Sequence, residues 1–390
     1  MASVQDKNEI KAVPFLALGG LFEADDVAAA QKVIAAAAGE GGNFFPLPEE
    51  NEFQTAFARH EGSKAAVAVN SCGTALDLCM MALGIKEGDE VITTPLTFVC
   101  TATCAAARGA KVVFADIDPR TLCLDPAAIG RKITPRTKAI IPVHFAGHPA
   151  DIEGFDKITR DTGVPVIYDA AHAVGTTFRG KPIGGAGKAS CYSFQSNKNI
   201  TTLGEGGAVT SDDAEFAEIV RRKKTFGYVY GPKLRVVTIG FNYRMTKPQL
   251  AVGLTQIAKA GRVIGLKLKK FQKMMQVLEG IGELRLPAGI EAGHGAHLFV
   301  VRVRPDKTNV TRDVLAGHLK TKYGVGTSIH YPAVWEWEAM KEAKYDRSDC
   351  ALAEAASQQV LSLPVFPNST DEQLEYVGQA IRNSFNELNQ

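Results

Sequence analysis

The 390-residue sequence predicts an α/β fold, in which a large domain with a mainly parallel sheet precedes a smaller α+β domain. Short apolar runs alternate with amphipathic stretches from about residue 60 to residue 210, a pattern typical of sheets that helices cover on both faces. After Thr246 the pattern changes to one long helix, followed by mixed strands and helices. A chain of this length exceeds one typical domain, so we expect two domains, residues 12–255 and 256–390.

Seven apolar segments are predicted to be the strands of the large sheet. They are residues 65–69, 90–94, 111–117, 138–145, 164–169, 190–194 and 207–211. Helix-like segments lie between most of them, for example residues 74–83 and 151–161. Ligands of open α/β sheets bind beyond the carboxyl ends of the strands, so polar residues that follow strands at that edge are the first candidates for a site.

The second part of the chain begins with a predicted helix over residues 248–279, which Gly253, Gly261 and Gly265 weaken. The smaller domain is then expected to contain strands at 297–304 and 327–331 and helices near 311–322, 348–360 and 370–387.

Composition excludes several classes of protein. The formal net charge of +2 provides no field that would attract nucleic acid or anionic lipid. The first residues lack the apolar stretch of a signal peptide, and no apolar run has the length of a membrane span, so we expect a cytoplasmic protein that is not membrane-bound. The seven cysteines include no CxxC pair and no His/Cys set at zinc spacing, which argues against a disulfide framework and a metal site.

Asp169 and Lys198 are the candidate catalytic residues. Asp169 ends an apolar strand, and Lys198 follows another strand in a turn rich in hydroxyl groups and glycine. A lysine amine can form a Schiff base with the aldehyde of pyridoxal 5′-phosphate (PLP), and a carboxylate can keep the pyridine nitrogen of that cofactor protonated. A lysine between two buried strands is partly desolvated, which lowers its pKa. Most lysines lie at the surface and strand-end acids often cap turns, so these two residues alone leave both interpretations open.

The segment after the first strand is a candidate phosphate site. Gly73, Thr74 and Ala75 would stand at the start of a helix, where backbone amides are free to bind an anion, and the Ser193 hydroxyl would add a donor. An ordinary Ser/Thr helix cap explains the same segment. GxGxxG and GxxxxGK[ST] are both absent from the sequence, so dinucleotide and nucleoside triphosphate sites lose support.

Other residues are weaker candidates. Phe98 would stack on a flat cofactor or pack in the core, and His172 would contact the cofactor ring or serve a structural role. Asn242 would reach an anion, in one interpretation across a dimer interface. Candidate substrate contacts are Arg244, His330 and Tyr331.

Taken together, these segments resemble the DegT/DnrJ-type sugar aminotransferases, a branch of the fold type I PLP enzymes, from about residue 12 to the C-terminus. Several motifs in the same order and spacing are far more specific than any single one. They are Cys72–Leu76, Gly88–Phe98, Val143–Asp151, Asp169–His172, Tyr192–Lys198, Gly204–Gly207 and Gly240–Met245.

The resemblance implies PLP as the cofactor, with Lys198 as the lysine that forms the Schiff base and then moves a proton. It implies that Asp169 pairs with the pyridine nitrogen, that Phe98 stacks on the ring and that His172 lies near the phenolic oxygen. The phosphate would be held by the amides of Thr74 and Ala75, by Ser193 and by Asn242 from a neighbouring subunit. Members of the family are homodimers at least. They usually transfer an amino group from glutamate or glutamine to a keto sugar, often nucleotide-linked, or to a keto-cyclitol.

Two departures from the family pattern and three alternatives remain. Cys72 stands where Ser is usual, and residues 41–49 differ from the usual glycine-rich pattern, so the resemblance does not extend to acceptor recognition there. A sugar dehydratase of the same fold would carry His in place of Lys198, and a PLP-binding regulatory protein would not need both Lys198 and Asp169. A hydrolase built on Asp169 and His172 lacks the GxSxG nucleophile turn.

Overall fold

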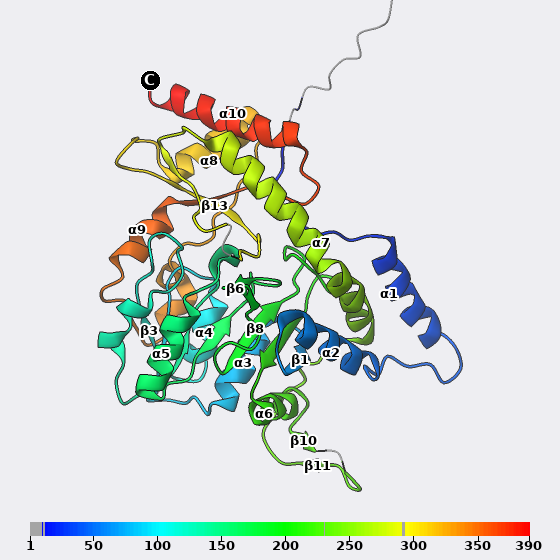
Figure 1. The fold of residues 1–390 in the computed structure, drawn as a ribbon. Helices are drawn as coiled ribbons and strands as arrows, with labels where there is room; N and C mark the ends of the chain where they lie inside the picture. The colour runs from blue at the N-terminus through cyan, green and yellow to red at the C-terminus, as the bar shows by residue number, and fades with distance from the viewer. Residues whose placement is uncertain (1–9, 11, 230, 291–292) are drawn as a thin grey trace, which may run out of the picture.

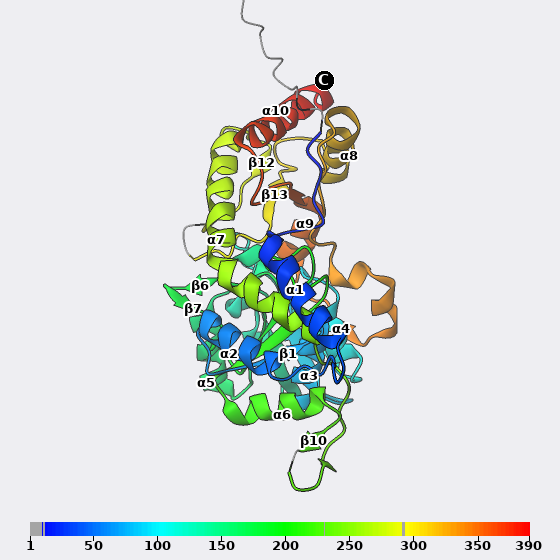
Figure 2. The same cartoon turned by 90° about the vertical axis from the view of Figure 1, so that its right-hand side faces the viewer.

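The computed structural model describes residues 10, 12–229, 231–290 and 293–390. The described part forms a large lower body and a smaller upper one, with helix α7 (Lys247–Leu278) running along both (Figures 1 and 2).

Each of the seven apolar segments overlaps a strand of the large sheet, and a short strand that the sequence did not predict, β14, extends one edge. These strands are β1 (Ala65–Val69), β2 (Glu90–Thr93), β3 (Lys111–Phe114), β4 (Thr137–Ile141), β5 (Ile167–Asp169), β8 (Ala189–Ser193), β9 (Gly207–Ser211) and β14 (Tyr345–Asp346). They pair in the orders β1-β9-β8-β5 and β14-β3-β2-β4. Parallel bridges from Ile140 to Val166 and from Val143 to Asp169 join the two halves. Only β9 runs antiparallel to its neighbours, so the sheet is mainly parallel, as predicted.

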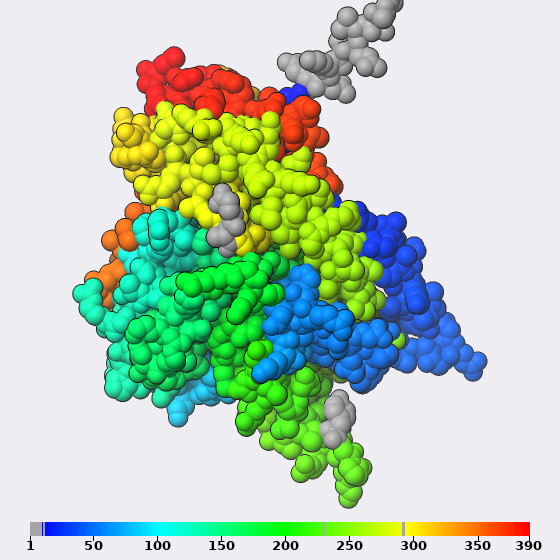
Figure 3. Space-filling model, in the orientation of Figure 1, coloured from blue at the N-terminus to red at the C-terminus, as the bar shows by residue number. Residues whose placement is uncertain are grey.

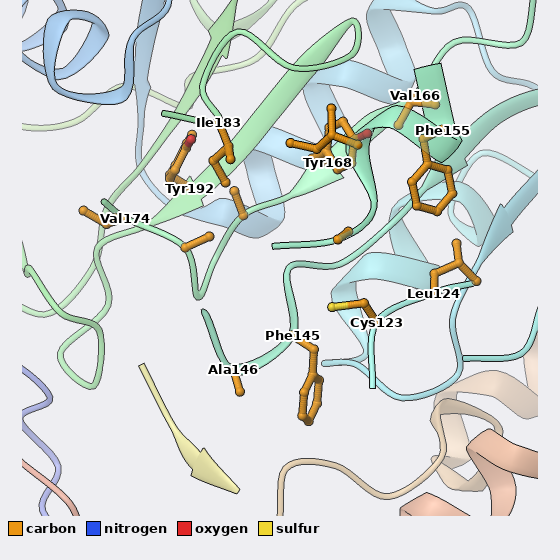
Figure 4. Close-up of a cluster of buried hydrophobic side chains, with 14 of the residues drawn as sticks. Cys123, Leu124, Phe145, Ala146, Phe155, Val166, Tyr168, Val174, Ile183 and Tyr192 are labelled. Atoms are coloured by element: carbon orange, nitrogen blue, oxygen red, sulfur yellow. The ribbon is translucent and has the colours of Figure 1, made fainter. Parts of the chain in front are cut away.

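Helices cover both faces of this sheet. The remaining helices are α1 (Ala24–Ala37), α2 (Glu49–Glu61), α3 (Cys72–Ala82), α4 (Cys100–Ala106), α5 (Ile152–Thr162), α6 (Ala214–Lys224), α8 (Arg312–Tyr323), α9 (Ala351–Gln359) and α10 (Asp371–Leu388). Apolar residues of α3, α4 and α6 form a core on one face, and those of α2, α5 and α7 form a core on the other. Figure 4 shows part of the second core, where the ring of Phe155 meets that of Tyr168 edge-on at 6.1 Å.

The long helix α7 lies within one residue of its predicted bounds. It begins after Thr246, which forms a capping box with Gln249, and Pro248 occupies its first turn, where a missing N–H has no cost. Close packing explains the glycine at position 253, because a Cβ there would lie 2.4 Å from the ring of Phe53. Gly261 and Gly265 have open space around them.

The smaller domain packs α8 and α10 with an antiparallel sheet of β12 (Leu284–Arg285), β13 (Phe299–Val303) and β15 (Val360–Leu363). The strand predicted at 327–331 is wrong, because that segment contributes only a single bridge, from Ser328 to Ser362. Besides α7, the chain passes between the two bodies three more times. It runs from Val13, which pairs with Val325, to α1; from the smaller domain to β14 in the large sheet; and from there back to β15. The boundary expected at residues 255/256 falls inside α7 and stays a prediction.

Short two-stranded segments complete the fold: β6 (Thr177–Phe178) with β7 (Lys181–Pro182), and β10 (Tyr228–Val229) with β11 (Arg235–Val236). The β10–β11 segment projects from the large body (Figure 3). Its apolar side chains Leu234, Val236 and Ile239 are 56%, 67% and 79% exposed. In the part of the chain that the structure describes, no helix combines the length and the apolar character needed to cross a membrane.

Candidate active site

A cavity of about 480 Å³ lies at the carboxyl ends of β2, β4, β5 and β8. It brings together eight residues that the sequence predicted for a site: Gly73, Phe98, Asp169, His172, Ser193, Lys198, His330 and Tyr331. Residues from five separate segments therefore meet at the sheet edge where ligands of α/β folds bind.

Asp169 ends β5 at the floor of the cavity and is only 3% exposed. Its Oδ2 accepts a hydrogen bond from Thr101 Oγ1 at 2.7 Å, and its Oδ1 accepts one from the Ala171 amide at 3.0 Å. Burial raises the pKa of this carboxyl group, against the opposing effect of these donors. No described residue forms an ion pair with Asp169, so a cationic nitrogen entering the cavity would complete its interactions.

Lys198 lies in the turn that connects β8 to β9. Backbone hydrogen bonds close this turn: the Ser196 amide donates to Gly204 O at 3.1 Å, and the Phe194 amide donates to Gly206 O at 2.8 Å. The lysine is 9% exposed, and burial lowers the pKa of its amine, as the sequence predicts for a lysine between buried strands. Within the described residues the Lys198 amine has no hydrogen-bond or salt-bridge partner, so it is available to react with an aldehyde.

Aromatic side chains form one wall of the cavity. Phe98 is 52% exposed, and its ring centroid lies 6.0 Å from that of Tyr331. The Tyr331 ring stacks on His172 at 6.0 Å, with 15° between the ring planes. A planar cofactor would find a flat apolar face here.

The protonation of His172 follows from its two neighbours. Its Nδ1 accepts a hydrogen bond from the Ala146 amide at 3.2 Å, so the proton of the neutral ring sits on Nε2. Nε2 then donates to the Tyr331 hydroxyl oxygen at 3.0 Å, which leaves the Tyr331 O–H free to donate to a ligand. Burial, followed by the charge of Lys198, lowers the pKa of His172 well below its ordinary value and keeps the ring neutral.

The start of α3 faces the same cavity, through Ser71, Cys72 and Gly73. Ser71 caps the helix: its Oγ accepts the Thr74 amide at 3.1 Å, and its carbonyl accepts the Ala75 amide at 3.1 Å. Thr74 and Ala75, which the sequence predicted as phosphate ligands, are thus engaged in the cap and do not line the described cavity. The amides of Cys72 and Gly73 are the free donors of this helix end among the described residues, beside the Ser193 hydroxyl.

Two predicted residues lie elsewhere in this chain. Asn242 is exposed near the base of the β10–β11 segment, where its Oδ1 accepts from Arg244 Nε at 2.9 Å. Arg244 borders a separate cavity of about 370 Å³ with Phe45 and Leu47. Asn242 and Arg244 can therefore serve the main cavity only from another copy of the chain.

Sequence reasoning missed several residues that line the cavity. Gln195 lies three residues before Lys198 in the same turn and could have been found from that position, whereas the neighbouring Asn197, which also lines the cavity, carries an amide that the sequence already offers to a phosphate. Thr97 belongs to the motif Gly88–Phe98 but was given no role, and Cys100 and the Asp169 partner Thr101 follow that motif. Among the described residues, no three His, Cys, Asp or Glu side chains are grouped to hold a metal ion.

The residues of the cavity fit a phosphorylated pyridine aldehyde. An unpaired buried carboxylate faces an unpaired buried amine, and free amides at a helix start lie beside them. The free amides of Cys72 and Gly73 suffice for this fit, so it does not require the amides of Thr74 and Ala75 as phosphate donors.

Comparison with known proteins gives consistent results. A model of the DegT/DnrJ/EryC1/StrS aminotransferase family matches residues 25–382. The chain is 37% identical over 347 residues to the spore coat polysaccharide biosynthesis protein SpsC of Bacillus subtilis (strain 168), covering 86% of this chain and 89% of SpsC. The fold is similar to that of NtdA from Bacillus subtilis with its cofactor PMP bound (27% identity, TM-score 0.87, covering 98% of this chain and 87% of NtdA). It is also similar to DesI in the presence of its TDP-sugar product (27% identity, TM-score 0.86, covering 95% of this chain and 93% of DesI).

Proposed function

The chain belongs to the DegT/DnrJ/EryC1/StrS aminotransferase family and is a PLP-dependent transaminase, and on this premise we propose that it aminates a keto sugar in amino-sugar biosynthesis. The proposed acceptor is a nucleotide-linked keto sugar or a keto-cyclitol, and the proposed donor is glutamate or glutamine. The observation that carries this proposal is that one cavity holds a buried amine, Lys198, and a buried carboxylate, Asp169, neither of which has an ion-pair partner among the described residues.

When bound, PLP supplies an aldehyde that accepts the amino group and a ring that stabilises negative charge at the substrate carbon. We assign the remaining work to side chains of this chain. Lys198 Nζ would bind the aldehyde, and after its displacement by the donor it would move the proton between the two carbon positions. Asp169 would hold the proton on the pyridine nitrogen, and Phe98 would fix the plane of the ring.

The proposed acceptor agrees with the chemistry of the cavity wall. Gln195, Asn197 and the Tyr331 hydroxyl are neutral donors and acceptors that suit sugar hydroxyl groups. Lys198 is the only lysine or arginine among the described lining residues, so the anionic groups of a nucleotide or of a donor amino acid need a cation from outside this cavity. The TDP-sugar product of DesI and the polysaccharide pathway named for SpsC support an activated sugar as the acceptor.

We further propose that two copies of the chain share their sites. The β10–β11 segment exposes a row of apolar side chains, which is unfavourable in water and typical of an interface. Asn242 and Arg244 stand at the base of this segment, outside their own cavity. In a homodimer each copy would supply Asn242 to the phosphate and Arg244 to an anionic substrate of the other copy.

Two alternatives concern the same cofactor. A sugar dehydratase would carry histidine at the position of Lys198, so the lysine favours transamination. A PLP-binding regulatory protein would bind the cofactor without turnover, and the half-reaction below separates it from an enzyme.

The central experiment loads the protein with the amine form of the cofactor and presents a panel of keto sugars that differ in keto position and in nucleotide. We expect the absorbance of the aldehyde form to return with one class of acceptor. Lys198→Ala should lose the absorbance band of the lysine-bound cofactor. A Lys198→Ala protein that keeps this band and reacts normally with glutamate would contradict the assignment.

Mixing two inactive variants tests the shared site. A 1:1 mixture of refolded Lys198→Ala and Asn242→Ala chains should place one intact site in each mixed dimer, so about one quarter of all sites should be active. Each variant alone is the control. Activity in the mixture no higher than the mean of the two variants would show that Asn242 does not act on the neighbouring site.

A further inference from the structure

Helix α7 contains a buried lysine without a carboxylate partner. Lys267 is 1% exposed, and within the described residues it forms no ion pair. Its Nζ donates to three neutral oxygens: Asn199 Oδ1 at 2.9 Å, His297 O at 2.8 Å and Gly19 O at 3.4 Å. Burial and the nearby charge of Lys198 lower the pKa of this amine to about 7. An unpaired buried cation lowers stability, so a compensating role is expected.

A second buried lysine on the same helix shows the ordinary arrangement. Lys259 is 7% exposed, but its Nζ lies 2.5 Å from Asp25 Oδ1, 2.7 Å from Asp26 Oδ2 and 3.3 Å from Glu23 Oε2. Three carboxylates thus compensate the charge of Lys259, whereas Lys267 binds an amide oxygen and two backbone carbonyls. The two lysines are both buried on α7, and they differ in whether carboxylates or neutral oxygens surround the amine.

The acceptors of Lys267 adjoin the turn that carries Lys198. Asn199 directly follows Lys198, and its Nδ2 donates to Gly295 O at 2.6 Å. The Asn199 side chain is therefore fixed at both ends, to α7 by Lys267 and to the segment 295–297 that leads into β13.

The third acceptor, Gly19, packs directly on the same turn. Its amide donates to Ser196 O at 3.0 Å, and a Cβ at this position would lie 1.8 Å from Asn197 O. A Cβ on Gly20 would lie 2.2 Å from Asn199 O. The Lys198 turn is therefore enclosed between the N-terminal segment and α7.

Gln256 makes a similar connection about three helical turns earlier on α7, hence on the same face. Its Oε1 accepts the Thr201 amide at 3.2 Å, and its Nε2 donates to Leu21 O at 2.8 Å. Two polar side chains of α7 thus hold both the Lys198 turn and the N-terminal segment.

We propose that Lys267 is a positioning residue, which fixes Asn199 and thereby holds the Lys198 amine where the cofactor aldehyde enters the cavity. This inference rests on the role proposed above for Lys198. Lys267 itself neither lines the cavity nor touches the reacting atoms.

The test compares full-length Lys267→Met, Lys267→Arg and Lys259→Met with the unmodified protein. Each protein is saturated with PLP and reduced with borohydride, and the fraction of Lys198 peptide that carries the pyridoxyl group is measured by mass spectrometry. The PLP dissociation constant and the thermal midpoint of the cofactor-free protein are measured in parallel.

Lys267→Met should remain folded but lose more than half of the Lys198 labelling at saturating PLP, with PLP binding weakened by about tenfold, because methionine cannot make the hydrogen bonds that Nζ donates to Asn199, His297 and Gly19. Lys267→Arg keeps the charge and should recover labelling. Lys259→Met should lower the thermal midpoint and leave labelling and PLP binding unchanged. If Lys267→Met does not fold, Asn199→Ala removes the same contact from the other side and should reduce labelling in the same way.

Full labelling and unchanged PLP affinity in a folded Lys267→Met or Asn199→Ala protein would overturn the inference. A loss of labelling in Lys259→Met equal to that in Lys267→Met would also overturn it, since destabilisation alone would then explain the effect. Absence of label on Lys198 in the unmodified protein would instead refute the role of Lys198 itself.

Discussion

Replacing Asp169 by Asn removes one charge and leaves the shape of the site intact. An asparagine can keep its Oδ1 toward the Ala171 amide and donate its Nδ2 to Thr101 Oγ1, which is free to accept because a hydroxyl group both donates and accepts. Thr101 Oγ1 also lies 2.8 Å from Thr97 Oγ1, so the pair can reverse its direction of donation. The fold should therefore tolerate the change.

The lost term is the charge-assisted hydrogen bond between the carboxylate and the ring nitrogen. Such a bond contributes about 1.5–3 kcal/mol, which corresponds to a rate lower by about 10- to 150-fold if the bond is made only as negative charge develops on the ring. Stability should change in the opposite direction. Burial raises the pKa of Asp169, so its charge opposes folding at neutral pH. The neutral amide removes this cost, and the cofactor-free variant should melt at the same temperature or higher.

The assay is the single-turnover reaction of PLP-loaded protein with glutamate, followed by the absorbance of the cofactor, with melting of the cofactor-free proteins alongside. Thr101→Val, which removes a partner of Asp169 but not the carboxylate, is the matched control and should cost less activity. A rate for Asp169→Asn within about threefold of the unmodified protein would refute the role of this charge, because less than 1 kcal/mol would then be involved.

Two further predictions concern stability. Burial lowers the pKa of His144 and His294 to about 3 and that of His330 to about 4, all below the ordinary value of about 6.5, so unfolding takes up protons in acid. The contribution of these three neutral histidines to the free energy of unfolding is complete above about pH 6.5. Below that pH it is lost, by about 4 kcal/mol per pH unit near pH 5 for the three groups together. Urea unfolding at pH 7.5, 6 and 5 measures this loss, and a free energy of unfolding that stays constant would contradict it. Gly261→Ala should raise the free energy of unfolding by about 0.5–1 kcal/mol, because its surroundings are open, whereas Gly253→Ala should lower it against the ring of Phe53. If both substitutions changed the thermal midpoint equally, the close approach of residue 253 to Phe53 would not limit stability.

The sequence predicts the large sheet well because its strands are continuous apolar runs. All seven expected segments overlap strands, and the residues that follow β5 and β8 converge on one cavity. The failure at 327–331 has a physical cause: this segment pairs through Ser328 alone, a tertiary contact that local composition does not encode. The edge strand β14 has only two residues and gave no pattern to detect.

In the site, too, some residues can be predicted from the sequence and others cannot. The sequence brings out Asp169 and Lys198 as candidates because Asp169 ends an apolar strand and Lys198 follows another, and the structure places both in one cavity. Thr74 and Ala75 were expected to offer free amides, but Ser71 uses both, which shifts the free donors toward the start of the helix. Lys267 stands in sequence beside lysines that are exposed or only partly buried, and only the packing of α7 on the N-terminal segment reveals that it is buried.

The walls of the cavity and the turn behind Lys198 come from almost the whole length of the chain, from Gly19 to Tyr331. Contacts this distant in sequence form late, since closing long loops is entropically costly. While the chain emerges from a ribosome, every strand of the large sheet except the edge strand β14 is made before α7 and the segment 295–331. We therefore expect a nascent chain ending before residue 295 to fold in part but to capture little cofactor, so that PLP binding reports completion of synthesis.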